Sequence, residues 1–230
     1  MRAIVLAVCL PLLLGACTDT GPWATDQEVQ AAAFRDDGPP TITLFTMINN
    51  RSHDGAHSGL MISGSQRIIF DPAGTFYHPH VPQRADVHYG ITDSMVDFYI
   101  DYHARETYHV VRHDVVVTPE QAEIALQRAQ AYGAVSKAFC TTSIHRIVRG
   151  VPGFESIPAS PRPKKVMRAF DEIPGATIRR YYDDSPDDRS DLITDSPKAR
   201  EDIRVVYGPE PSVQERRRQQ AAAAAAARQQ

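Results

Sequence analysis

One cysteine of the chain is well placed to act as a nucleophile. Cys140 stands at the start of a segment in which apolar residues recur at spacings of three and four, up to Val148. Such spacing predicts a short helix with one buried face, which Gly150 ends. The unpaired N–H groups and the positive dipole end of a helix favour a thiolate in its first turn. We therefore expect Cys140 to be a nucleophile, provided that a base can reach it.

A histidine and a carboxylate elsewhere in the chain supply the partners that a cysteine nucleophile needs. His57 opens an expected strand and shares a face with Gly59, which leaves space beside the imidazole. The returning strand ends in Asp71, which a suitable hairpin register would place beside His57. There the carboxylate would hold the imidazole in one tautomer and stabilise its charged form. The residues predict His57 as the base and Asp71 as its orienting partner.

Each of these residues also has an ordinary structural interpretation. His57 could be a polar residue of an edge strand, and Asp71, which precedes Pro72, could cap a turn. Cys140 could be buried and inert. The chain has nine histidines, and His53 in the preceding loop could stand in for His57. The catalytic interpretation therefore depends on contacts that the sequence does not fix.

Zinc binding is a second chemistry open to the histidines. The stretch 76–88 is rich in histidine and contains Asp86, and a separate set comprises His103, His109 and His113. Spaced histidine pairs are common by chance, and the chain has no His-Glu-x-x-His sequence. We therefore expect neither a metal ion nor a cofactor.

The N-terminus has the pattern of a secretory signal. Arg2 precedes an apolar stretch, 3–14, that is too short for a good transmembrane span. The following Leu-Gly-Ala-Cys sequence resembles a bacterial lipoprotein lipobox, which implies that Cys17 is lipidated and becomes the mature N-terminus. Thr18 in the next position favours the outer membrane. The expected location is the bacterial cell envelope, lipid-anchored and facing the periplasm; the alternative is an ordinary signal peptide with a chance cysteine.

Under this interpretation, each of the three cysteines has a different role. Cys9 leaves with the signal and Cys17 carries lipid, so Cys140 has no partner for an intrachain disulfide. The compartment is oxidising, where an idle exposed thiol is a liability. An unpaired cysteine there favours a working thiol.

Composition excludes a strong nucleic-acid binder and limits the number of domains. The 230 residues include 28 acidic and 25 basic residues, which gives a net charge of −3. We expect a lipoprotein signal at 1–16, a tether at 17–40, one α+β domain at 41–182 and a disordered, charged and alanine-rich tail at 183–230. The arginines near the C-terminus indicate a solvated tail rather than a groove.

Hydrophobic periodicity and turn residues predict the elements of the domain. The residues 71–88 read as an irregular loop, and Thr118, Pro119 and Gln121 form a strong helix start with a capping box. The expected strands are 41–48, 56–63, 66–71, 108–117 and 176–182. The expected helices are 93–106, 119–132, the cysteine helix ending near 148, and 163–172, with a short helix at 27–34 inside the tether.

The order of these features resembles a known family. The block 57–64, the strand 67–71 and a later cysteine helix resemble the circularly permuted papain-like fold of NlpC-type proteins and the lecithin retinol acyltransferase family. The resemblance covers about 41–151 and at its widest reaches 182. It implies an antiparallel sheet with helices packed on it, with Cys140 as nucleophile, His57 as base and Asp71 as the third polar residue. Two features depart from the family: Phe139 replaces a frequent Asn or Asp, and Asp71 lies farther from His57 than the usual third residue, often His.

Two functions remain open from the sequence. The first is a periplasmic cysteine hydrolase or acyltransferase that acts on an amide or ester bond of a cell-wall peptide, lipoprotein or lipid. The second is a non-catalytic envelope lipoprotein that uses the same fold for binding or assembly. The partners expected in either case are the membrane through the lipid anchor and a substrate or ligand of the envelope, without nucleic acid.

Overall fold

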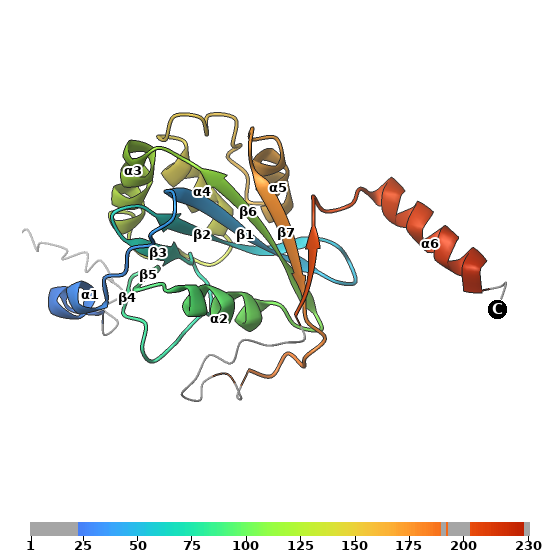
Figure 1. Ribbon diagram of the computed structural model, residues 1–230, viewed down its shortest axis with the longest axis horizontal. Helices are drawn as coiled ribbons and strands as arrows, with labels where there is room; N and C mark the ends of the chain where they lie inside the picture. Colours follow the sequence, from blue (N-terminus) through green and yellow to red (C-terminus); the bar gives the residue numbers. More distant parts are fainter. Residues whose placement is uncertain (1–22, 190–191, 193–202, 228–230) are drawn as a thin grey trace, which may run out of the picture.

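The computed structural model describes residues 23–189, 192 and 203–227. The expected signal at 1–16, the expected lipidation site Cys17 and the start of the expected tether lie outside the described residues. The described chain is an α+β protein with one antiparallel sheet in the order β4-β5-β3-β2-β1-β6-β7-β8 (Figure 1). The structure thus confirms the expected class and the antiparallel sheet with helices packed on it.

Strands that are neighbours in the sequence form hairpins near the centre of the sheet. Further strands extend the sheet at both edges. Alternating apolar residues and tight turns favour this pairing of sequence neighbours. The strands are β1 (Thr41–Asn49), β2 (Gly55–Ser63), β3 (Arg67–Phe70), β4 (Gln83–Arg84), β5 (Val87–Tyr89), β6 (Tyr108–Val116), β7 (Thr177–Tyr182) and β8 (Arg204–Tyr207).

Helices cover both faces of the sheet. Helices α3, α4 and α5 lie on one face and α2 on the other, while α6 projects away from the body (Figure 1). No described helix is both long and apolar enough to cross a membrane. The helices are α1 (Asp26–Ala32), α2 (Asp93–His103), α3 (Pro119–Gln130), α4 (Cys140–Val148), α5 (Pro163–Asp171) and α6 (Val213–Ala227).

The period-two alternation of the strands creates two apolar cores. On β2, Leu60 and Ile62 face the core beneath α3, α4 and α5, while Met61 faces the core beneath α2. Burial of both faces explains why the central strands are rich in large apolar residues. His57 has the parity of Met61, so its side chain leaves the sheet on the α2 side.

The two halves of β2 differ in their neighbours. Residues 60–63 pair with β3, whereas β1 pairs with nearly the whole length of β2. The half of β2 from Gly55 to Gly59 therefore has no strand beside it on the β3 side among the described residues. This open edge gives the chain after β3, and the N-terminus of α4, access to the backbone of β2.

Two expectations about organisation need correction. The loop expected at 71–88 contains β4 and the start of β5, because the hairpin of β4 and β5 pairs with β3. The tail expected to be disordered at 183–230 contains β8, which pairs with β7, and the helix α6. Backbone pairing with an existing strand edge stabilises β8, and local composition does not reveal that contact.

The capping box at the start of α3 tests how local sequence contributes to stability. The side chain of Thr118 accepts a hydrogen bond from the Gln121 N–H, and Gln121 bonds back to the Thr118 N–H. Thr118→Ala should lower the free energy of unfolding by about 1 kcal/mol, measured by urea denaturation, because it leaves helix N–H groups without an acceptor.

The chain offers a matched control for this substitution. Thr25 forms the same kind of box with Glu28 on α1, a helix without buried residues. Thr25→Ala should change the global free energy of unfolding by much less. Equal effects of the two substitutions would contradict the argument that α3 is capped as part of the cooperative core.

Candidate active site

Cys140 is the first residue of α4, as the sequence predicts. The preceding Phe139 makes no side-chain capping bond, and the first turn contains no acidic residue. The N–H groups at this end of the helix therefore have no side-chain acceptor from the cap position to compete with the sulfur. The N–H of Thr141 hydrogen-bonds to the thiol and stabilises its charged form.

Packing fixes the position of this helix end. The opposite side of α4 buries Ile144, Ile147 and Val148 completely in the core. The hydroxyl of Thr141 donates a hydrogen bond of 2.7 Å to the carbonyl of Ser160. The sulfur of Cys140 is consequently held by a rigid element, and this residue is 7% exposed.

His57 connects the sulfur to a carboxylate. Its Nε2 lies 2.7 Å from Oδ1 of Asp71, and its ring also hydrogen-bonds to the thiol of Cys140. Because Asp71 occupies Nε2, the remaining ring nitrogen, Nδ1, is the one left for the sulfur. The structure thus brings together all three residues predicted from the sequence. The side chain of His57 is 19% exposed, so part of the ring is reachable from solvent.

The open edge of β2 is where these groups meet. Cys140 comes from the α4 side of the sheet, whereas Asp71 follows β3 and contacts groups on the α2 side. The backbone N–H of Ser58, next to His57, donates a hydrogen bond to the sulfur. A strand paired with this half of β2 would occupy that N–H and block the approach of the helix.

A tyrosine that sequence reasoning missed helps to hold Asp71. The hydroxyl of Tyr99 on α2 donates a hydrogen bond of 2.8 Å to the same Oδ1 that binds His57. Burial raises the pKa of Tyr99 well above its usual range, so the hydroxyl keeps its proton and remains a donor. The apolar spacing of α2 identifies Tyr99 as buried, but not its partner.

Two glycines leave room for this carboxylate. A Cβ at Gly59 would collide with the hydroxyl of Tyr99 and lie 3.3 Å from Oδ1 of Asp71. A Cβ at Gly74 would collide with the Asp71 carboxylate itself. The space expected beside Gly59 is therefore filled by the groups that orient His57.

Asp86 ties the two loops of the site together. Its Oδ2 accepts hydrogen bonds from the N–H of Ala73, at 3.2 Å, and from the N–H of Val135, at 2.8 Å. Ala73 belongs to the loop after Asp71, and Val135 to the loop that leads to Cys140. One half-buried carboxylate thus fixes the relative position of the base and nucleophile segments. The sequence suggests Asp86 only as a metal ligand.

The electrostatics favour a thiolate and an imidazolium. Burial alone would raise the pKa of Cys140, but the hydrogen bond and charge of His57 outweigh it and lower that pKa below its usual value. Burial likewise opposes the charge of His57, yet the neighbouring Asp71 raises the pKa of His57 to about 10. Despite the unfavourable burial, His57 holds the pKa of Asp71 well below its usual range.

The contacts that run from Cys140 through His57 to Asp71 form a relay. Two further buried histidines flank Asp71 without joining this relay. Burial lowers the pKa of His103 and of His88 to about 4 each, so both are neutral near pH 7. The ring of His103 lies 6.1 Å from that of His57 at an interplanar angle of 22°, and its Nδ1 donates to the Tyr99 carbonyl. These rings pack against the relay, and His57 alone contacts the sulfur among them.

The other candidates from the sequence are dispersed. His53 lies in the β1–β2 turn, His109 contacts Glu210 and His113 contacts Asp171. Across residues 23–189, 192 and 203–227, no group of three or more His, Cys, Asp or Glu side chains is arranged to hold a metal ion. The structure therefore gives the suggested zinc sets no common centre.

Comparisons with family models, with curated proteins and with solved structures find no match to the chain. A function for this protein is therefore inferred from the geometry of the site alone.

The pKa shifts predict an unusually reactive thiol. The ion pair of Cys140 and His57 exists from a pH below the ordinary thiol pKa up to about pH 10, where His57 loses its proton. At pH 6, Cys140 should therefore react with iodoacetamide roughly tenfold faster than free cysteine, measured by mass spectrometry of the labelled peptide.

The same measurement includes its control. His57→Gln should move the pH dependence of alkylation upward, toward that of an ordinary thiol, because the imidazolium is gone. His80→Gln, at an exposed histidine outside the relay, should leave it unchanged. A wild-type thiol that reacts at pH 6 no faster than free cysteine would contradict the assigned ion pair.

Gly59 provides a steric test of the relay. Gly59→Ala should displace Tyr99 and Asp71, lower the free energy of unfolding by about 1–3 kcal/mol and weaken alkylation at pH 6. Gly64→Ala, just beyond the other end of β2, meets the movable end of Glu123 and should have little effect on alkylation. The measurements are urea denaturation and the labelling rate; normal labelling of Gly59→Ala would argue against this geometry.

Proposed function

We propose that the protein is a cysteine hydrolase or acyltransferase, with Cys140 as nucleophile, His57 as base and Asp71 as the residue that orients the base. The observation that carries the proposal is the continuous relay from the Cys140 thiol through His57 to Asp71, with 2.7 Å between Nε2 and Oδ1. A nucleophile, a base in contact with it and a third group that orients the base are the parts such catalysis needs.

The chain order of the site supports a permuted papain-like fold as part of this proposal. The histidine strand β2 and its hairpin partner β3 precede the cysteine helix α4 in sequence. The sheet is antiparallel, and α4 packs on it with the cysteine at its N-terminus. This is the arrangement implied by the resemblance to NlpC-type proteins and the lecithin retinol acyltransferase family.

The first half of the proposed reaction transfers an acyl group to the enzyme. The sulfur of Cys140 attacks the carbonyl carbon of an amide or ester, and a C–S bond forms. The carbonyl oxygen becomes an oxyanion beside the uncapped N-terminus of α4, where the N–H of Cys140 stabilises it. The C–N or C–O bond then breaks, and His57 gives its proton to the leaving group.

The second half releases the acyl group. Water, or an amine in the case of transfer, loses its proton to His57 and attacks the thioester carbonyl. The C–S bond breaks, and the thiolate of Cys140 reforms beside the protonated His57. Asp71 keeps its negative charge throughout and stabilises the imidazolium in both halves.

The proposed substrate follows from the proposed location. The lipobox resemblance at Cys17 supports a location on the periplasmic side of a bacterial membrane, and Thr18 supports the outer membrane. A thiolate in that compartment meets cell-wall peptides, lipoproteins and lipids, which carry amide and ester bonds. The tether before β1 would hold the site within reach of them.

An acyl-enzyme assay tests the mechanism without knowledge of the natural substrate. With p-nitrophenyl acetate, the wild-type protein should release a burst of nitrophenol and carry an acetyl group on Cys140, detected by mass spectrometry. Cys140→Ala should lose the burst and the adduct. Asp71→Asn should slow the burst by about 100-fold, because the imidazole loses its orienting carboxylate.

The control is Asp54→Asn, which removes an exposed carboxylate from the loop before β2 and should keep the wild-type rate. A burst that survives Cys140→Ala would overturn the proposed nucleophile. A wild-type protein that forms no adduct while its fold is intact would favour the alternative of a non-catalytic lipoprotein that binds or assembles.

A further inference from the structure

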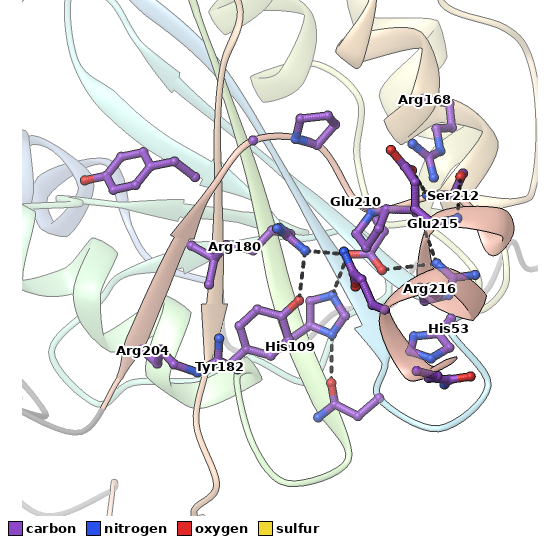
Figure 2. A pocket seen from close by; sticks show the side chains of 18 residues that line it. His53, His109, Arg168, Arg180, Tyr182, Arg204, Glu210, Ser212, Glu215 and Arg216 are labelled. Carbon is purple, nitrogen blue, oxygen red and sulfur yellow. Dashed lines mark hydrogen bonds and ion pairs between the residues drawn. The ribbon is translucent and has the colours of Figure 1, made fainter. Parts of the chain in front are cut away.

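A large pocket lies toward the β7–β8 edge of the sheet, away from the cysteine site at β2. Its volume is about 800 Å³, which is in the range of small-molecule sites. Residues of β6, β7, β8, α5, the β1–β2 turn and the first turns of α6 line it (Figure 2). Three inter-strand spacings, roughly 14 Å, separate β7 from β2, so this pocket is distinct from the proposed active site.

Positive charge is concentrated in this pocket although the whole chain has a net charge of −3. Four arginines and two glutamates line it, an excess of two positive charges. Burial and the charge of Arg216 lower the pKa of His53, which also lines the pocket, and likewise the pKa of nearby Lys164. Both shifts are those expected beside an excess of cations. The sequence-based expectation of a solvated arginine tail is therefore wrong for Arg216, whose side chain is only 14% exposed, whereas Arg204 lines the pocket and stays exposed.

Glu210 organises the centre of the pocket. It is only 3% exposed, and its Oε2 lies 3.1 Å from Nε2 of His109 and 3.8 Å from Nη1 of Arg180. Its Oε1 lies 3.5 Å from Nη1 of Arg216. A buried carboxylate with these partners is a structural group, since its loss would leave the cations around it without compensation.

Contacts within the protein orient two of the pocket arginines before any ligand arrives. Arg204 lies over the ring of Tyr182, 4.3 Å from its centre, and Arg168 contacts Asp171 at 3.3 Å. Figure 2 shows Arg204 at one end of the pocket, Arg168 and Arg216 at the other, and Arg180 between them. Guanidinium groups match the oxygens of phosphate or carboxylate, and contacts that already orient them reduce the entropy lost on binding.

Two buried nitrogen atoms of residues that line the pocket are unsatisfied. Nε of Arg180 and Nδ1 of His53 are buried and have no hydrogen-bond partner. Buried polar atoms in proteins are nearly always paired, so unpaired ones in a pocket indicate a missing partner. The guanidinium Nε is always a donor, and its missing partner must be an acceptor.

We propose that this pocket binds a small soluble ligand that carries at least two phosphate groups. Arginines at both ends of the pocket fit anionic groups that are separated along the ligand (Figure 2). They come from four different elements, α5, β7, β8 and α6, and therefore surround the space. Tetrahedral phosphate oxygens accept hydrogen bonds from several directions, whereas a planar carboxylate favours a single fork.

Isothermal titration calorimetry of the whole protein with inorganic pyrophosphate tests the proposal, with citrate as the polycarboxylate comparison. Pyrophosphate should bind, more weakly at high salt. The double variant Arg168→Gln with Arg204→Gln should reduce its affinity by about tenfold or more. Arg217→Gln removes the same charge from α6 at a position that does not line the pocket and should bind like the wild-type protein.

The outcomes separate the possibilities. Binding that the double variant loses and Arg217→Gln keeps supports the proposal, provided that thermal unfolding shows both variants folded. No binding by the wild-type protein, or equal loss in both variants, overturns it. Binding of citrate in preference to pyrophosphate overturns the assignment to phosphate. None of these readouts depends on Cys140, so the proposed hydrolase activity is tested separately.

Discussion

The hydrogen bond between His57 and Asp71 is the interaction on which the candidate site depends. Asp71 is almost completely buried, and only one of its two carboxylate oxygens has a hydrogen-bond partner. A buried carboxylate is costly unless an opposite charge and good donors compensate it. The imidazolium of His57 and the hydroxyl of Tyr99 provide that compensation at the same oxygen. The charge state of the relay is therefore part of the stability of the domain, and not only of its reactivity.

The unpaired half of β2 explains how residues from opposite faces of a sheet meet. A fully paired strand would separate the α4 side from the α2 side, because its backbone groups would all bind neighbouring strands. Since β3 ends opposite Leu60, the N–H of Ser58 is free to bind the sulfur of Cys140. The loop after β3 then carries Asp71 past this edge to the other side of His57. The same strand thus contributes its first half to the site and its second half to the core.

The candidate active site and the arginine-lined pocket lie at different parts of one sheet. At β2, three ionisable groups are packed tightly, and the positive His57 lies between the negative Cys140 and Asp71. Beyond β7, arginines surround a cavity and retain an excess of positive charge around Glu210. The segment after β7 creates the second environment, because β8 extends the sheet and residues of β8 and of the start of α6 line the pocket. The domain therefore extends well past the boundary at 182 that composition suggests.

The sequence alone determined the main elements and the three relay residues. Spacing placed Cys140 at a helix start, and strand parity put His57 beside Gly59, because both signals arise within a few residues of chain. Only the tertiary structure decided that the carboxylate of Asp71 faces His57, since the sequence left its hairpin register open. The same holds for the hydroxyl of Tyr99, which belongs to a distant helix whose periodicity shows burial but no partner. Strand β8 and its cationic pocket escaped sequence analysis because a charged, proline-containing segment becomes ordered only by pairing with a strand edge formed elsewhere.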